Sequence, residues 1–126
     1  MGTNARHILL IDDEEDIRDV VAMSLETIAG WRVSCANSGP DGIRLAELAS
    51  PDAIILDVMM PDQDGPQTFR LLQQNATTKD IPVLFFTAKV QALERQRLEA
   101  LGASGTLAKP FDPMKLADQI IQVLGW

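Results

Sequence analysis

The sequence predicts an α/β protein with a doubly wound, five-stranded parallel sheet and helices on both faces. Five short apolar runs alternate with helical patterns along the 126 residues, and the connections between them are short. Several runs are continuously apolar, which is typical of parallel strands buried on both faces. Five strands are too few for an eight-stranded barrel, so an open doubly wound sheet is the favoured arrangement.

The first half of the chain is expected to hold three strands and two helices. The acids after the first apolar run suit a helix N-terminus, where they complement the helix dipole, and Gly30 suits its end. Ser38 can cap the second helix, and Pro51 interrupts the pattern before the third strand. The expected strands are residues 7–11, 31–36 and 53–57, and the expected helices run from the acids to about residue 29 and over residues 38–48.

The second half continues the alternation. Pro66 stands at a first-turn position, Gly102 suits a helix end, and Asp112 with Pro113 is predicted to open the last helix. The fourth helix has a patchy apolar stripe, and a weakly anchored helix moves at little cost. The expected strands are residues 81–86 and 106–108, and the expected helices are residues 66–75, 91–101 and 113 onward.

Apolar residues at helical spacing are expected to face the core. They include Val20, Ile28, Leu48 and Leu71. The single cysteine, Cys35, excludes an internal disulfide and favours a reducing compartment, and we interpret it as a small buried hydrophobic residue.

Length and charge limit the classes of function. We expect one domain over residues 1–126, long enough for a real core. The net charge of −7 argues against direct binding of nucleic acid, which needs a basic surface. The N-terminal apolar run, residues 8–11, is too short for a signal peptide or a membrane span, so no membrane contact and a cytoplasmic location are expected.

Polar residues follow four of the predicted strands. Asp57 ends the third strand, where open α/β sheets place their ligands, although Asp is also common at the start of a turn. Asp12 and Asp13 follow the first strand, Thr87 the fourth, and Lys109 the fifth. Singly, Thr87 is more often a strand former and Lys109 a solvated charge. Their joint occurrence at the ends of the strands indicates a functional site.

This set of motifs resembles the receiver domain of two-component response regulators, the family of the chemotaxis response regulator. The resemblance covers essentially the whole chain, because the motifs stand in the family's order and spacing. The matching segments are residues 10–14, 56–62, 87–88 and 109–111. The resemblance implies a flavodoxin-like fold with strand order 2-1-3-4-5 and five helices, and it suggests a cis peptide bond between Lys109 and Pro110.

The resemblance further implies that Asp57 accepts a phosphoryl group beside a bound Mg²⁺ ion. Asp13 and Asp57 would bind the ion directly, Asp12 mainly through water, and the carbonyl oxygen of Met59 would add a ligand. In that strand order the three carboxylates crowd together, so either their pKa values rise or a cation joins them. Mg²⁺ suits such a site because it prefers oxygen ligands.

Thr87, Ala88, Lys109 and Thr106 are the phosphate-binding and switch residues that the resemblance implies. Lys109 would pair with a phosphoryl oxygen or, before transfer, with Asp57. Thr87 would donate its hydroxyl to the phosphate and draw the following loop inward, shifting a two-state equilibrium. Most relatives have Tyr or Phe where Thr106 stands, so we expect output through backbone movement of the segment after Thr87 instead of an aromatic side chain.

Met59 and Lys89 occupy positions that flank the path of the hydrolytic water in the family. A thioether orients water poorly, and Lys89 can hold the phosphate. We therefore expect slow loss of the phosphoryl group.

The expected function is that of a response regulator. A sensor histidine kinase or a histidine phosphotransfer protein would donate the phosphoryl group, and a downstream protein target or a fused output domain would receive the signal. The chain would not be an enzyme beyond its own phosphorylation and dephosphorylation. Whether it stands alone or is a fragment of a larger regulator stays open.

Three alternatives have different requirements. A phosphatase of the haloacid-dehalogenase type needs Asp-x-Asp, but Met59 takes the place of the second acid. A flavodoxin-like carrier needs a phosphate loop rich in Ser, Thr and Gly after the first strand, where this chain has carboxylates. A phosphorylation-silent binding module with the same fold is opposed by the complete set of acids.

Overall fold

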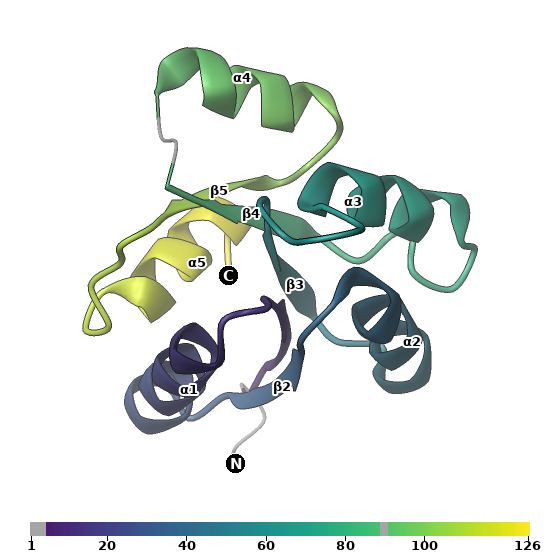
Figure 1. Cartoon of the computed structure of the whole chain (residues 1–126). Helices are drawn as coiled ribbons and strands as arrows, with labels where there is room; N and C mark the ends of the chain where they lie inside the picture. Colours follow the sequence, from purple (N-terminus) through teal and green to yellow (C-terminus); the bar gives the residue numbers. More distant parts are fainter. Residues whose placement is uncertain (1–4, 89–90) are drawn as a thin grey trace.

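The computed structural model describes residues 5–88 and 91–126 of the chain. Five strands form one parallel sheet in the order β2-β1-β3-β4-β5, with helices on both faces (Figure 1), which confirms the predicted class and strand order. The strands are β1 (His7–Ile11), β2 (Arg32–Ala36), β3 (Ala53–Asp57), β4 (Val83–Thr87) and β5 (Gly105–Ala108). The helices are α1 (Glu15–Ser24) with its π-helical continuation η1 (Leu25–Ala29), α2 (Gly39–Ala49), α3 (Gly65–Gln74), α4 (Ala92–Ala100) and α5 (Leu116–Leu124).

Each face of the sheet has its own apolar core. Successive strand residues point to opposite faces, so Leu10 and Ile55 enter one core while Leu9 and Ile54 enter the other. The first core joins the sheet to α1, η1 and α5, and the second joins it to α2, α3 and α4. All four side chains are buried, because helices cover both faces of the sheet, and the interior positions of the central strands are accordingly apolar.

The first predicted helix has the expected extent but two geometries. It is α-helical to Ser24 and π-helical from Leu25 to Ala29. Gly30 ends it with φ of 72°, a left-handed conformation that glycine adopts without steric cost. Of the described residues, none belongs to a helix long and apolar enough to cross a bilayer.

The predicted start of the last helix is wrong by three residues. Asp112 does cap the local backbone, because its Oδ1 accepts the N–H of Met114 at 2.9 Å. The N–H of Lys115 then donates to the carbonyl oxygen of Asp112 at 2.9 Å, which closes a tight turn in place of an α-helical turn. Regular α5 begins only at Leu116.

Several expected core positions are instead exposed. Leu48 is 79% exposed, and Val20, Ile28 and Leu71 also face outward. The buried face of these helices is narrower than their apolar pattern suggests. It consists of residues such as Val21, Leu25, Ala46 and Leu72.

The expectation that Cys35 is buried is also wrong. Its strand, β2, is the outermost of the sheet, and the structure leaves the Cys35 side chain exposed. Partial burial still raises the pKa of the Cys35 thiol, with the charge of Arg18 acting in the opposite direction. Cys35 is therefore a surface residue with weak thiolate character.

Candidate functional site

Three acids meet where the order of the strands reverses. β1 and β3 are neighbours in the sheet, so Asp12, directly after β1, lies beside Asp57, the last residue of β3. Asp12 and Asp57 are buried, whereas Asp13 is exposed. One carboxylate oxygen from each of the three acids lies within 4.8 Å of the others, so the predicted cluster exists.

Lys109 joins the two buried acids. Its Nζ lies 2.8 Å from Oδ2 of Asp12 and 3.2 Å from Oδ1 of Asp57, with Oε1 of Glu14 further away at 3.9 Å. The backbone positions it: the N–H of Lys109 donates to the carbonyl oxygen of Thr87 at 2.9 Å, beyond the end of the β4–β5 ladder. The predicted contact between Lys109 and Asp57 is confirmed, as is the cis bond to the following proline.

The pKa values of Asp57 and Lys109 are shifted by burial and by the charges around them. Burial, and then the negative charge of Asp12, raise the pKa of Asp57 to about 6, although Lys109 and the N–H of Met59 act in the opposite direction. Burial alone would lower the pKa of Lys109, but its hydrogen bonds and charge interactions with Asp12 and Asp57 together raise it. A cation added beside Asp57 would stabilise its charged form, because it would offset the burial of the carboxylate and the repulsion from Asp12.

The loop after β3 folds back tightly onto the phosphoacceptor candidate. The N–H of Gly65 donates to the carbonyl oxygen of Val58 at 3.0 Å. A Cβ atom at Gly65 would stand 2.5 Å from the carbonyl oxygen of Asp57, so only glycine fits. The sequence marked Gly65 as a loop residue but did not reveal this close approach, because the contact depends on the path of the loop in space.

Met59 presents its backbone to the cluster and its side chain to solvent. Its N–H points at Oδ1 of Asp57 across 3.4 Å, while 70% of the residue is exposed. The structure thus places Met59 beside the acids, and its role as a metal ligand stays a prediction.

Thr87 and Ala88, two of the predicted switch residues, lie at the carboxyl end of β4, whereas Thr106 lies two residues further back along the sheet. Thr87 ends β4 and is buried, and Ala88, next to it, is exposed. Thr106 is half-buried on β5, paired with Phe85 of β4, and lines a cavity of about 260 Å³ between α4, β5 and α5. Lys89 lies outside the described residues.

Arg18 is a residue near the site that the sequence did not reveal. Its Nη1 donates to the carbonyl oxygen of Asp12 at 2.8 Å, which ties α1 to the end of β1. No sequence motif signals this bond, because an arginine in the first turns of a helix usually points to solvent.

The cluster fits Mg²⁺. All the donors are oxygens, two of the three carboxylates are buried, and among the described residues Lys109 forms ion pairs with Asp12 and Asp57. A hard divalent ion would offset the repulsion between the carboxylates, and the exposed Asp13 leaves room for the water ligands that Mg²⁺ retains.

Comparison with known proteins identifies the fold and the family. The family model of the response regulator receiver domain matches residues 8–121. The phosphate regulon transcriptional regulatory protein PhoB of Klebsiella pneumoniae is 36% identical over 120 residues, which cover 95% of this chain and 52% of PhoB. The DNA-binding dual master transcriptional regulator RpaA of Synechocystis is 38% identical over 117 residues, covering 93% of this chain and 48% of RpaA. The chain thus spans about half the length of the curated relatives it matches.

Solved structures agree in fold. The chemotaxis response regulator CheY4 of Vibrio cholerae superposes with a TM-score of 0.88 at 32% identity, covering 95% of this chain and 99% of CheY4. The receiver domain of the sensor histidine kinase PA1611 of Pseudomonas aeruginosa, described with a magnesium ion coordinated in its active-site cleft, gives 0.84 at 27% identity and covers 97% and 99%. The matching sequence, fold and acid cluster together show that this chain belongs to the response regulator receiver domains of two-component systems.

Proposed function

We propose that Asp57 accepts a phosphoryl group from a sensor histidine kinase or a histidine phosphotransfer protein in a magnesium-dependent reaction. The observation that carries this proposal is the geometry around Asp57. One carboxylate oxygen of Asp57 lies within 4.8 Å of carboxylate oxygens of Asp12 and Asp13, and Oδ1 of Asp57 lies 3.2 Å from Nζ of Lys109. A nucleophilic carboxylate, two further metal-binding acids and a cation are what phosphoryl transfer to aspartate requires.

In this proposal Asp13 and Asp57 hold Mg²⁺ directly, Asp12 holds it mainly through water, and the carbonyl oxygen of Met59 completes the protein ligands. The bound ion supplies positive charge that neutralises the carboxylates and the phosphoryl oxygens.

The chain's own residues perform the transfer. An oxygen of Asp57 attacks phosphorus, the bond from phosphorus to the donor imidazole nitrogen breaks, and an acyl phosphate forms with the imidazole as leaving group. Lys109, held beside Asp57 before transfer, then pairs with a phosphoryl oxygen. Charge stabilisation therefore supplies most of the catalysis.

The signal is then read as a change of backbone position. The hydroxyl of Thr87 donates a hydrogen bond to the phosphoryl group, and Ala88 and the loop beyond it move inward. Thr106 is too small to act as the aromatic switch found in most relatives, so the movement reaches α4 through the backbone. The weak anchoring of α4 supports this route, since Leu98 is its one buried residue while Leu93 and Leu101 are exposed.

We also propose a long-lived phosphoryl group, because the thioether of Met59 orients a hydrolytic water poorly and Lys89 can hold the phosphate. Residues 1–126 form one receiver domain that acts in the cytoplasm on a downstream protein or a fused output domain. Its net charge of −7 favours a protein target over direct contact with nucleic acid.

Intact mass after incubation with acetyl phosphate tests the proposal, with and without Mg²⁺, on wild type and Asp57→Asn. The expected result is a magnesium-dependent gain of one phosphoryl group that the variant does not show. A chain that gains no phosphoryl group under any condition would instead be a phosphorylation-silent module.

A further inference from the structure

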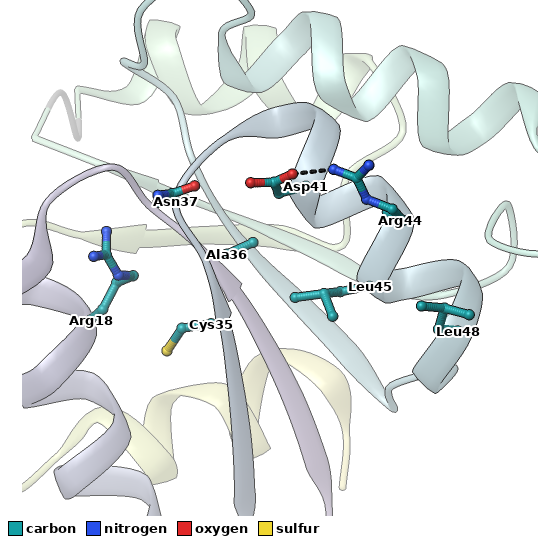
Figure 2. A pocket seen from close by; sticks show the side chains of 8 residues that line it. All are labelled: Arg18, Cys35, Ala36, Asn37, Asp41, Arg44, Leu45 and Leu48. Carbon is teal, nitrogen blue, oxygen red and sulfur yellow. Dashed lines mark hydrogen bonds and ion pairs between the residues drawn. The ribbon is translucent and has the colours of Figure 1, made fainter.

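A groove lies over the outer edge of β2, at the side of the sheet away from β3. Its volume is about 540 Å³, with α1 forming one wall and α2 the other (Figure 2). Arg18 stands on the α1 wall, Arg44 and Leu48 on the α2 wall, and Cys35 on the strand between them. None of these residues belongs to the acid cluster, so the groove is separate from the phosphorylation site.

The floor of the groove is a strand edge with outward-facing peptide groups. In the described part of the chain β2 pairs only with β1. The N–H of Arg32 donates to Arg6, and the carbonyl oxygen of Ala36 accepts from Asp12, so these residues direct their peptide groups toward β1. Residues in a parallel ladder alternate in this respect. The N–H and C=O groups of Val33 and Cys35 therefore point away from β1 at the open edge of the sheet, and Cys35 itself lines the groove.

The groove is lined by two arginines, one aspartate (Asp41) and apolar surface, on a chain of net charge −7. Arg18 uses one N–H on the carbonyl oxygen of Asp12, and Arg44 pairs with Asp41 one turn earlier in α2. A guanidinium has five N–H donors, so each arginine can bind a further carboxylate. Leu48, 79% exposed, adds an apolar surface on the α2 wall.

We propose that this groove binds an extended segment of a partner protein that has two successive acidic residues flanked by aliphatic ones. The segment would add to β2 as a sixth strand and bond to the peptide groups of Val33 and Cys35. Successive side chains of a strand point to opposite faces, so one acid would meet Arg18 and the next Arg44. A flanking aliphatic side chain would then cover Leu48.

Fluorescence anisotropy without Mg²⁺ tests the contact independently of phosphorylation. The probe is a labelled peptide with a central Glu-Glu pair flanked on each side by Thr and Val. Arg18→Gln and Arg44→Gln should each raise its Kd about threefold and the double variant about tenfold, as expected of exposed ion pairs. Arg70→Gln removes an equal charge from the exposed face of α3 and should leave Kd unchanged.

A peptide with Lys-Lys in place of Glu-Glu should bind at least about tenfold more weakly. If Arg70→Gln weakened binding as much as the double variant, the attraction would be unspecific and the proposal wrong. If binding did not saturate up to about 1 mM peptide, the binding free energy would be weaker than about −4 kcal/mol. That result would also overturn the proposal.

Amide exchange measured by NMR tests strand addition itself. Saturating peptide should slow exchange at Val33 and Cys35, whose N–H groups lie at the open edge of β2, and leave Arg32, already bonded within the sheet, unchanged. Unchanged exchange at Val33 and Cys35 would exclude a sixth strand. If the chain instead dimerised through β2, seen as a concentration-dependent mass by sedimentation, the groove would serve a second copy and not a partner segment.

Discussion

At the scale of single residues, the site is decided by three side chains from different strands. Asp12 and Asp57 are buried side by side, and Lys109 reaches both of them from the end of β5. Burial, and then the charge of Asp12, raise the pKa of Asp57 to about 6, because the single ammonium of Lys109 offsets them only in part. The proposed phosphorylation site therefore lowers the stability of the fold.

Asp57→Asn is expected to stabilise the metal-free protein at neutral pH. The folded-state pKa of about 6 lies above the ordinary 3.8, so the Asp57 carboxylate lowers stability progressively as pH rises from about 4 to above 6. The shift sets a ceiling near 3 kcal/mol, and loss of the Lys109 contact reduces the expected gain to about 1–2 kcal/mol. Urea unfolding at pH 7 and below pH 4 measures this, and the gain should disappear at the lower pH.

The control for that experiment is Asp19→Asn, which neutralises an exposed acid on α1. If Asp57→Asn were no more stable than this control at pH 7, the ionised Asp57 would not be destabilising.

Met59→Asn is expected to shorten the life of the phosphoryl group on Asp57. An amide can orient a water by hydrogen bonding where the thioether cannot. An increase of about tenfold in the hydrolysis rate corresponds to about 1.4 kcal/mol of barrier. Loss of phosphate, followed by intact mass after removal of acetyl phosphate, checks this. Met114→Asn, at an equally exposed methionine, serves as control, and equal rates in both variants would contradict the prediction.

At the scale of elements, the helices differ in how firmly the sheet holds them. α3 begins with a capping box formed by Asp64 and Gln67 and buries Phe69 and Leu72. In contrast, α4 has no side-chain cap and buries only Leu98. The order of stability follows from these contacts, since few buried apolar groups mean low local unfolding free energy.

Phosphorylation is expected to change amide exchange between residue 87 and residue 101, including α4. The reason is that Thr87 precedes the least anchored helix, so a shift of Thr87 meets little resistance there. Hydrogen exchange with mass spectrometry, with and without acetyl phosphate, provides the measurement. Peptides from α2 should keep their exchange rates, and an unchanged 87–101 segment would refute output through this backbone.

At the scale of the whole molecule, the two edges of the sheet have different surroundings. β5 lies between α4 and α5 beside the switch residues, whereas β2 ends the sheet on the far side, below the groove. The acid cluster lies between them, at the ends of β1 and β3. The proposed phosphorylation and the proposed partner binding would therefore use separate surfaces of one small domain.

Mg²⁺ is expected to stabilise the whole fold because it binds only where the acids are assembled. At a free concentration ten times its Kd, the gain is about 1.4 kcal/mol, which corresponds to a rise of roughly 5 °C in Tm. Thermal unfolding with and without Mg²⁺ measures it. The Asp13→Asn variant should lose most of this stabilisation by Mg²⁺. If Mg²⁺ stabilised the variant as much as wild type, the ion would bind elsewhere.

The sequence by itself determined the alternation of strands and helices and the positions of Asp12, Asp57, Thr87 and Lys109 at strand ends. These features are local, since continuous apolar runs and caps are read within a few residues. Helix boundaries were less certain, as Asp112 shows: its cap closes a turn instead of opening α5.

The sequence pattern alone does not fix which strands are neighbours. Only the tertiary structure decided this order, and with it the contact of Lys109 with Asp12 and Asp57. It also placed Cys35 on an exposed edge, gave Gly65 its contact with the backbone of Asp57, and set Arg18 beside the groove. The meeting of Lys109 with the acids and the position of Cys35 depend on segments far apart along the chain, and the contact of Gly65 depends on the path of its loop in space. Periodicity describes one segment at a time, so contacts between segments become known only when the segments are packed together.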